Sequence, residues 1–119
     1  MSWHIELGKW GEQQARTYIT EKSFFILSVN WKYSRYEIDI IASREGVLHF
    51  IEVKTRSNTR FGFPEESVDK QKMKRLMRAA DHYLYLHPHW KWVQYDVLSI
   101  LLSKDNSPGF FMLEDVYPD

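Results

Sequence analysis

Two apolar stretches separated by a short turn most constrain how this chain folds. Residues 36–42 alternate and then become wholly apolar, and residues 47–54 are mostly apolar until their last positions. The polar turn cluster from Ser43 to Gly46 joins them, so they are expected to pair as an antiparallel β-hairpin. With Glu45 and Gly46 as the two central turn residues, Gly46 occupies a position that needs a positive φ.

This turn fixes which side chains face one another across the hairpin. Asp39 then lies opposite Glu52, and Glu37 lies opposite Lys54. Because side chains alternate between the two faces of a strand, all four are predicted to share one face. A one-residue slip would abolish the arrangement, so the prediction depends on the turn.

Two carboxylates placed opposite each other repel. Their Cβ atoms would lie about 5 Å apart, which corresponds to roughly 3 kcal/mol at an effective dielectric constant of 20. A shared proton, a basic partner such as Lys54, or a bound divalent cation would relieve the repulsion. Oxygen ligands of this kind predict Mg²⁺ or Mn²⁺ as the cation. The alternative is an exposed strand with ordinary cross-strand Glu–Lys pairs.

A cation held by two carboxylates is suited to phosphodiester hydrolysis. It neutralises charge on the phosphate and lowers the pKa of a bound water. Lys54 lies two residues beyond Glu52 on the same face, where it can orient that water or stabilise developing charge. Asp39, Glu52 and Lys54 are therefore the predicted catalytic group.

The remaining periodicity predicts a small α/β domain. Helices are expected at residues 5–22 and 68–86, and strands at residues 24–29, 36–42, 47–54, 92–102 and 110–116. The order α-β-β-β-α-β-β gives a five-stranded sheet with helices packed on it. A chain of 119 residues fits one such domain, spanning residues 1–119.

Charge is distributed unevenly, although the formal net charge is zero. Residues 54–78 carry eight Lys and Arg against three acids, whereas residues 94–119 carry one Lys against five acids. A basic face attracts phosphates, and a solvated helix surface explains the same pattern. The candidates for contacts with nucleic acid are Thr55, Arg56, Arg60, Lys70, Lys72, Lys74 and Arg78.

Several classes of protein are excluded by composition. The chain has no cysteine, which excludes a disulfide scaffold and a thiolate metal site. No apolar run approaches the roughly 18–20 residues that span a bilayer. The first ten residues lack the apolar core of a signal peptide, so the expected location is the cytoplasm.

Five short motifs occur in order along residues 8–86. They are Gly8-x-x-Gly11-Glu12, Asn30-Trp31, Glu37-Ile38-Asp39-Ile40-Ile41-Ala42, Phe50-Ile51-Glu52-Val53-Lys54-Thr55-Arg56 and Phe61-Gly62-x-Pro64. Together they resemble the bacterial YraN family. The spacing of Asp39 and Glu52-x-Lys54 is similar to the PD-(D/E)xK nuclease signature, here without its proline.

The resemblance implies a restriction-endonuclease-like fold with a mixed sheet, similar to archaeal Holliday-junction resolvases. It implies a metal-dependent nuclease acting on DNA, branched DNA included. The residues that it assigns to the site are the metal ligands Asp39, Glu52 and the Val53 carbonyl, the catalytic Lys54, the helix glutamate Glu12, the outer neighbour Glu37, and the polar pair Gln71 and Lys72.

The resemblance leaves three questions open. Tyr36 stands where the family usually has glycine, and a bulky ring there would reshape the approach of a substrate or stack on a base. Resolvase-like relatives act as dimers, which implies a homodimer by analogy. Two alternatives to a nuclease remain: a nucleic-acid-binding module that does not cleave, and a protein-interaction domain with a vestigial site.

Overall fold

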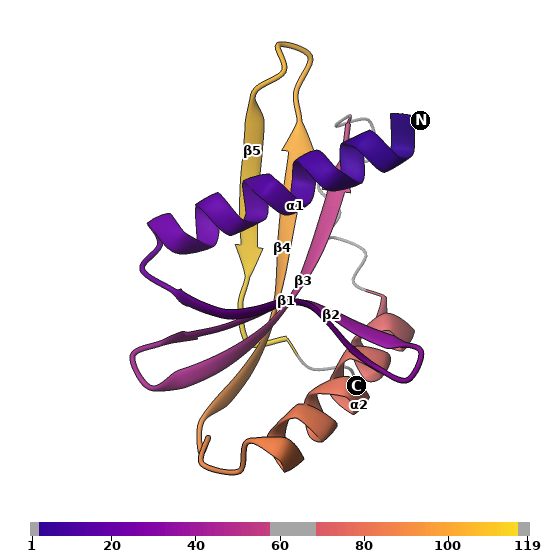
Figure 1. Ribbon diagram of the computed structural model, residues 1–119. Coiled ribbons are helices and arrows are strands. Elements are labelled where there is room, and N and C mark those ends of the chain that lie inside the picture. The colour runs from indigo at the N-terminus through magenta and orange to yellow at the C-terminus, as the bar shows by residue number, and fades with distance from the viewer. Residues whose placement is uncertain (1–2, 58–68, 117–119) are drawn as a thin grey trace.

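The structure, a computed structural model, describes residues 3–57 and 69–116 (Figure 1). Its elements are α1 (Trp3–Glu21), β1 (Phe25–Tyr33), β2 (Tyr36–Arg44), β3 (Val47–Arg56), α2 (Lys70–Leu86), β4 (Val93–Leu102) and β5 (Pro108–Leu113). The predicted α/β class and element order are confirmed. The largest difference in bounds is at β1, which continues to Tyr33 instead of ending at Val29.

The five strands form one mixed sheet in the order β1-β2-β3-β4-β5. The pairs β1–β2, β2–β3 and β4–β5 are antiparallel, and β3–β4 is parallel. Parallel neighbours need a long crossover, which the segment containing α2 supplies. Helix α2 begins at an N-cap, Asp69, whose carboxylate accepts the backbone N–H groups of Gln71 and Lys72.

The β2–β3 hairpin has the register that its turn predicts. Arg44 pairs with Val47, and the ladder continues to Ile40 and Ile51. Glu45 and Gly46 have φ values of 52° and 80°, so both central residues of the turn are left-handed. This geometry matches the right-handed twist of the strands and explains the glycine.

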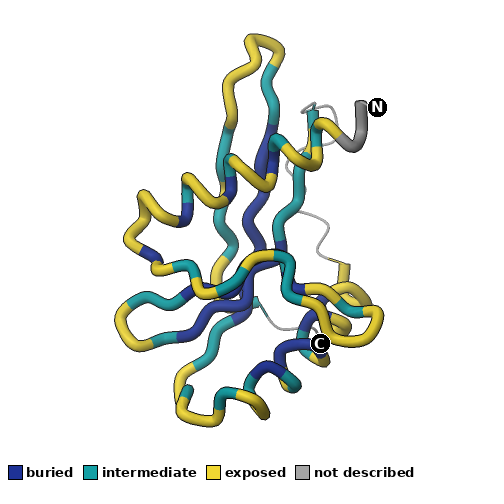
Figure 2. Tube along the Cα trace, viewed as in Figure 1, coloured by how far each residue is buried: buried dark blue, intermediate teal, exposed yellow. Residues whose placement is uncertain are grey.

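The two helices cover opposite faces of the sheet. Phe50 packs in one buried cluster with Leu76 of α2, whereas its neighbour Ile51 packs in a second cluster with Ile19 of α1. Figure 2 shows the buried residues gathered in β3 and β4, between the helices. A central strand buried on both faces is apolar throughout, which accounts for the long apolar run that ends at Glu52.

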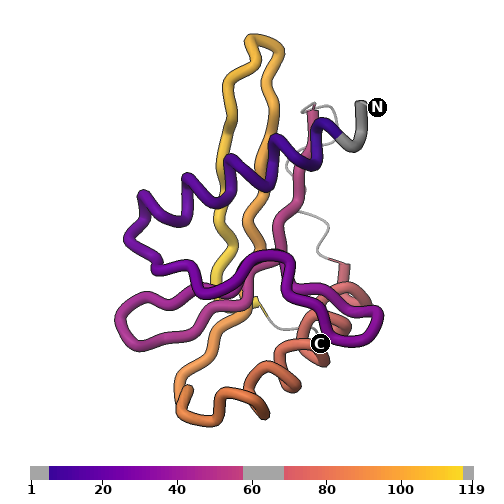
Figure 3. Tube along the Cα trace, viewed as in Figure 1, coloured from indigo at the N-terminus to yellow at the C-terminus, as the bar shows by residue number. Residues whose placement is uncertain are grey.

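The β1–β2 turn lies against α2, although the two segments are far apart in the sequence (Figure 3). The Tyr33 ring stacks on the His82 ring at 3.8 Å between centroids, and the Trp31 ring meets the Tyr83 ring edge-on. These contacts bring the start of β2 close to the helix that follows β3. Within the described ranges, no helix has both the length and the apolarity needed to cross a membrane.

Candidate active site

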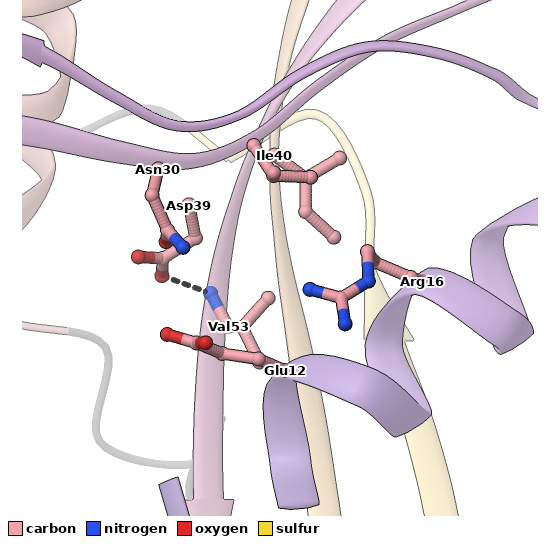
Figure 4. Close-up of a pocket in the computed structure, with 7 residues that line it drawn as sticks. Glu12, Arg16, Asn30, Asp39, Ile40 and Val53 are labelled. Carbon is pink, nitrogen blue, oxygen red and sulfur yellow. Dashed lines mark hydrogen bonds between the residues drawn. The ribbon is translucent and has the colours of Figure 1, made fainter. Parts of the chain in front are cut away.

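Strands β2 and β3 part at one end, and the site lies in the gap. Their ladder ends at Ile40 and Ile51, while β3 stays paired with β4 as far as Arg56. Beyond this point the Val53 N–H donates to Asp39 Oδ2 at 2.8 Å (Figure 4). Asp39 and Glu52 are thus neighbours across the gap, one step beyond the last paired residues.

A bend in β1 and β2 turns Asp39 toward this gap. Asn30 lies between the pairs Val29–Ile40 and Trp31–Ile38, opposite Asp39, and has a φ of 50°. In a regular strand Ile38 and Ile40 would share a face, yet Ile38 packs in the α2 cluster and Ile40 in the α1 cluster.

Asn is one of the few residues that adopt positive φ readily. Figure 4 shows the Asn30 side chain beside the Asp39 carboxylate. Asn30 is a site residue that periodicity did not identify. A single Asn in a strand gives no local sign of which residue lies opposite it.

Glu52 is the most deeply buried carboxylate of the site, with 5% of its surface exposed. Its Oε1 lies 2.9 Å from Lys72 Nζ, which reaches it from the first turn of α2. The repulsion predicted for the two carboxylates is therefore partly relieved by a basic partner. That partner is Lys72, whereas the hairpin alone suggested Lys54.

The pKa of Asp39 is strongly affected by this arrangement. Burial, and next the nearby Glu52 charge, raise the pKa of its carboxyl to about 7. The Val53 N–H and the Lys72 ammonium lower the pKa, but their effect is smaller than the rise. The carboxyl therefore remains partly protonated up to about pH 7 in the metal-free protein, and a proton is a second of the predicted ways to relieve the repulsion.

Lys54 is half-buried two residues after Glu52 on the same strand. Desolvation, and next the charge of Lys72, lower the pKa of its amine, and the Glu52 charge opposes the shift. Two lysines from different elements thus lie near one buried glutamate. Helix α2 begins where it does because Asp69 caps it, and this cap fixes the position of Lys72.

Glu12 approaches the gap from the opposite face of the sheet. Its side chain is exposed on α1, and Figure 4 shows its carboxylate near Asp39 and Val53. The preceding residue, Gly11, is buried against β3, where an added Cβ would overlap Thr55 Oγ1. The absence of a side chain at position 11 lets α1 lie this close.

Two open cavities meet at Asp39. One of about 300 Å³ lies on the α1 side and is lined by Leu7, Gly8, Glu12, Asp39, Val53 and Thr55. The other, of about 310 Å³, lies on the α2 side and includes Glu37, Asp39, Glu52 and Lys72 in its lining. Since Asp39 and Val53 line both, the same carboxylate is accessible from both sides.

The residues predicted to contact nucleic acid are distributed unevenly around these cavities. Thr55 lines the α1-side cavity and Lys72 the α2-side cavity. Lys70, Lys74 and Arg56 are exposed but line neither. Arg60 lies outside the described residues.

The two outer-shell predictions have different positions. Glu37 lines the α2-side cavity and adds to the charge that raises the Asp39 pKa. Gln71 is exposed in the first turn of α2, where its backbone N–H is bound by Asp69. Arg35 and Arg75 also line the α2-side cavity and were not predicted. Arg75 follows Lys72 by three residues on the helix, which is a signal that sequence spacing offered.

A second buried ionic cluster lies on the other part of the hairpin. His49 Nδ1 and Asp96 Oδ2 are 2.6 Å apart, and Asp96 Oδ1 accepts the Asp115 N–H at 3.0 Å. Glu114 lies within 4.8 Å of both and pairs with Arg44 at 3.1 Å. These groups satisfy one another and hold the residues after β5 against the sheet, away from the gap.

The comparison with known proteins shows where this chain belongs. A relative from Bacteroides thetaiotaomicron, named UPF0102 protein, is 42% identical over 118 residues, which cover 99% of this chain and 98% of the relative. UPF0102 proteins from Dictyoglomus thermophilum and Syntrophomonas wolfei are 42% and 41% identical over 100 and 104 residues, covering 83% and 86% of this chain and 85% and 90% of the relatives.

The family profile gives the same result over the region that contains the site. It matches residues 11–100, from the buried glycine of α1 to the end of the β4 core. The match includes the gap between β2 and β3 and the first turn of α2. The chain therefore belongs to the uncharacterised protein family UPF0102.

Proposed function

We propose that this protein is a metal-dependent nuclease that hydrolyses phosphodiester bonds in DNA. The observation that carries the proposal is the pair of carboxylates at the gap, Asp39 and Glu52. They are close enough for the Glu52 charge to raise the Asp39 pKa, and the Lys72 ion pair is made with Glu52 and not with Asp39. A chain with no use for a cation here has little reason to bury both.

The donor set fits a hard divalent cation. Two carboxylates and the Val53 carbonyl are oxygen ligands, which Mg²⁺ and Mn²⁺ prefer, and water completes such coordination shells. When bound, the cation supplies charge neutralisation at the phosphate and a more acidic water. Glu12 is exposed and free of the sheet core, so its carboxylate can turn toward the same point.

The two lysines take different roles in this proposal. Lys54 lies beside Glu52 on β3 and stabilises charge that develops on the phosphate oxygens. Lys72 binds Glu52. A cation held by Glu52 would compete with this ion pair, and the Lys72 ammonium would then be available to the substrate. The proposed setting is the cytoplasm, with branched DNA and a homodimer following from the likeness to resolvases.

One observation favours a second candidate function. The Lys72–Glu52 ion pair at 2.9 Å already gives the buried glutamate a cationic partner. A protein that binds nucleic acid without cleaving it would need nothing more. Metal binding and cleavage must therefore be measured separately.

The test combines Mn²⁺ titration calorimetry with cleavage of duplex, single-stranded and four-way-junction DNA in Mg²⁺ or Mn²⁺. Asp39→Asn should abolish Mn²⁺ binding. Lys54→Met should retain it and lower the cleavage rate by about 100-fold or more. Asp81→Asn and Lys104→Met make the same changes at exposed positions away from the gap and should behave as wild type.

The outcomes separate the candidates. Mn²⁺ binding that survives in Asp39→Asn would contradict the metal site. DNA binding with no cleavage in either metal would favour the binding module over the nuclease. Cleavage that is equal in Lys54→Met and wild type would remove Lys54 from the reaction.

A further inference from the structure

A second concave surface adjoins the carboxylates and has a different chemistry. A cavity of about 480 Å³ is lined by Arg35, Tyr36 and Arg75. The same three residues also line the α2-side cavity that contains Asp39 and Glu52. The two cavities therefore lie next to each other and share these three residues.

Tyr36 contacts two of the arginines near this cavity. The guanidinium carbon of Arg35 lies 5.6 Å from the centre of the Tyr36 ring. Hydrogen bonding by Arg35, together with Arg78, lowers the pKa of the Tyr36 hydroxyl. The ring itself is half-buried and packs against the α2 core cluster. The hydroxyl thus lies between guanidinium groups from the turn and from the helix.

Helix α2 continues the positive charge from the carboxylates to this cavity. Lys72, Arg75 and Arg78 follow one another at intervals of three residues, so neighbouring members are adjacent on the helix surface. At 1.5 Å per residue, the row spans about 9 Å. It begins at Glu52, where Lys72 is bound, and ends at Tyr36.

The three arginines lack acidic partners within the described ranges. Among residues 3–57 and 69–116, the structure shows no ion pair that involves Arg35, Arg75 or Arg78. Arg35 and Arg75 line the cavity, and Arg78 hydrogen-bonds to the Tyr36 hydroxyl at its wall. These like charges repel one another unless an anion lies between them. Guanidinium groups bind phosphate through paired N–H donors, which makes phosphate the fitting anion.

We propose that Arg35, Arg75 and Arg78 bind a backbone phosphate of the nucleic-acid strand next to the one at Asp39 and Glu52. Tyr36 positions the guanidinium groups and does not itself take part in the reaction. The substrate class rests on the proposed function, whereas binding to the strand requires no cleavage. The shared lining with the carboxylate cavity favours a polynucleotide over free phosphate, which would need only one of the two cavities.

The experiment measures the affinity for a fluorescein-labelled 12-nucleotide DNA strand by fluorescence anisotropy in EDTA, over a series of NaCl concentrations. Arg35→Gln/Arg75→Gln should raise Kd about tenfold or more. It should also lower the slope of log Kd against log salt by roughly 1–1.5, because each lost phosphate contact removes about 0.7 for a single strand. Lys91→Gln, at an exposed position after α2, should change Kd less than twofold.

Tyr36→Phe tests the positioning role separately. It keeps the ring and removes the hydroxyl, so it should weaken binding about two- to threefold with little change in the salt slope. Because Arg35 and Arg75 are exposed, all variants should keep the wild-type melting temperature. Inorganic phosphate at 10 mM should displace little of the labelled strand, since it occupies only one of the contacts.

Hydrolysis of bis(p-nitrophenyl) phosphate in Mn²⁺ distinguishes the two proposals. This substrate has one phosphodiester and no neighbouring phosphate, so Arg35→Gln/Arg75→Gln should lose less hydrolysis rate than strand affinity, whereas Lys91→Gln should hydrolyse it at the wild-type rate. Weaker strand binding in the double-arginine variant, with no hydrolysis by any protein, would keep the arginine site and reject the nuclease. Strand affinity and salt slope equal to wild type in that variant would overturn the arginine site, whatever the hydrolysis rate.

Discussion

Asp39 owes its unusual environment to three neighbours on the two adjacent strands, β1 and β3. Asn30 bends the backbone opposite it, the Val53 N–H binds it, and the Glu52 charge lies beside it. The backbone of the sheet fixes the position of each neighbour, so the Asp39 carboxyl has little freedom to move into solvent. The proton that it keeps near neutral pH is the result.

The pH dependence of stability follows from this carboxyl. Its pKa is about 7 in the folded protein and about 3.9 in an unfolded chain. The folded state therefore binds more protons between these values, and the free energy of unfolding falls as pH rises from about 4 to about 7. Asparagine does not ionise, so the Asp39→Asn variant does not lose stability in this way. At pH 8 in EDTA the variant should be more stable than the wild-type protein by about 1–3 kcal/mol.

Urea unfolding of both proteins at pH 4.5 and pH 8 checks this expectation. Asn keeps an oxygen that can accept the Val53 N–H, so a difference in stability between the two proteins does not come from the loss of this hydrogen bond. The stability difference should shrink toward pH 4.5. A wild-type protein that is the more stable one at pH 8 would contradict the assigned pKa direction.

Sequence spacing predicted the close carboxylates because one turn fixes the hairpin register. The turn at Glu45 and Gly46 fixes which residues of the two strands face each other. Continuing this register places Asp39 opposite Glu52. The same reasoning did not identify Lys72 as the partner of Glu52, or Arg35 and Arg75 as cavity residues. Those contacts join segments separated by the chain between β3 and α2, for which no local register exists.

At the scale of elements, α1 packs closely against β3 at Gly11. Gly11 is buried on Thr55, and this contact places the next residue, Glu12, at the cavity. The other glycine of α1, Gly8, is not packed in this way, because a Cβ there would meet nothing within 4 Å.

The two glycines make a matched pair of substitutions. Gly11→Ala should destabilise the protein by about 1–3 kcal/mol, because its Cβ overlaps a threonine side chain that the strand holds in place. Gly8→Ala should be neutral or stabilising by up to about 1 kcal/mol, because it adds helix propensity without a clash. Thermal melts of both variants measure the difference.

A third variant isolates the contact itself. In Gly11→Ala combined with Thr55→Ala, most of the overlap disappears, and stability should recover toward that of Thr55→Ala alone. If the two changes are simply additive, the clash at Thr55 is not the cause.

The elements themselves were predictable where one pattern dominates. The two central strands of the hairpin and the amphipathic α2 follow from periodicity. Strand β1 was predicted too short because Asn30 and Lys32 interrupt its apolar run. They are tolerated because β1 is an edge strand and bends there, and neither fact is visible in its own residues.

At the scale of the whole molecule, the proposed metal site and the folded state are coupled. The ligands come from β2 and β3, and they meet only when the hairpin is folded and α2 is docked. An unfolded chain presents no such pair. A cation that binds there therefore stabilises the fold as a whole.

Thermal denaturation should show this coupling and its pH dependence. At a Mn²⁺ concentration of 100 times Kd, stability rises by about 2.7 kcal/mol, or roughly 10 °C in Tm for a domain of this size. A proton on Asp39 competes with the cation, so the same Mn²⁺ concentration should raise Tm more at pH 8 than at pH 6.

Asp39→Asn is the control, and its Tm should not respond to Mn²⁺ at either pH. An equal rise in Tm for wild type and Asp39→Asn would mean that the ion acts elsewhere. The buried His49–Asp96 cluster is one place to look in that case.

The hydrogen bond from Val53 to Asp39 ties a backbone amide to the ionisation of one side chain. A carboxylate holds an N–H more tightly than a protonated carboxyl does. The chemical shift of the Val53 amide should therefore follow the charge on Asp39, while its neighbours in the β3–β4 ladder remain unaffected. The protein thus contains its own spectroscopic reporter, through which the state of the gap can be followed without substrate.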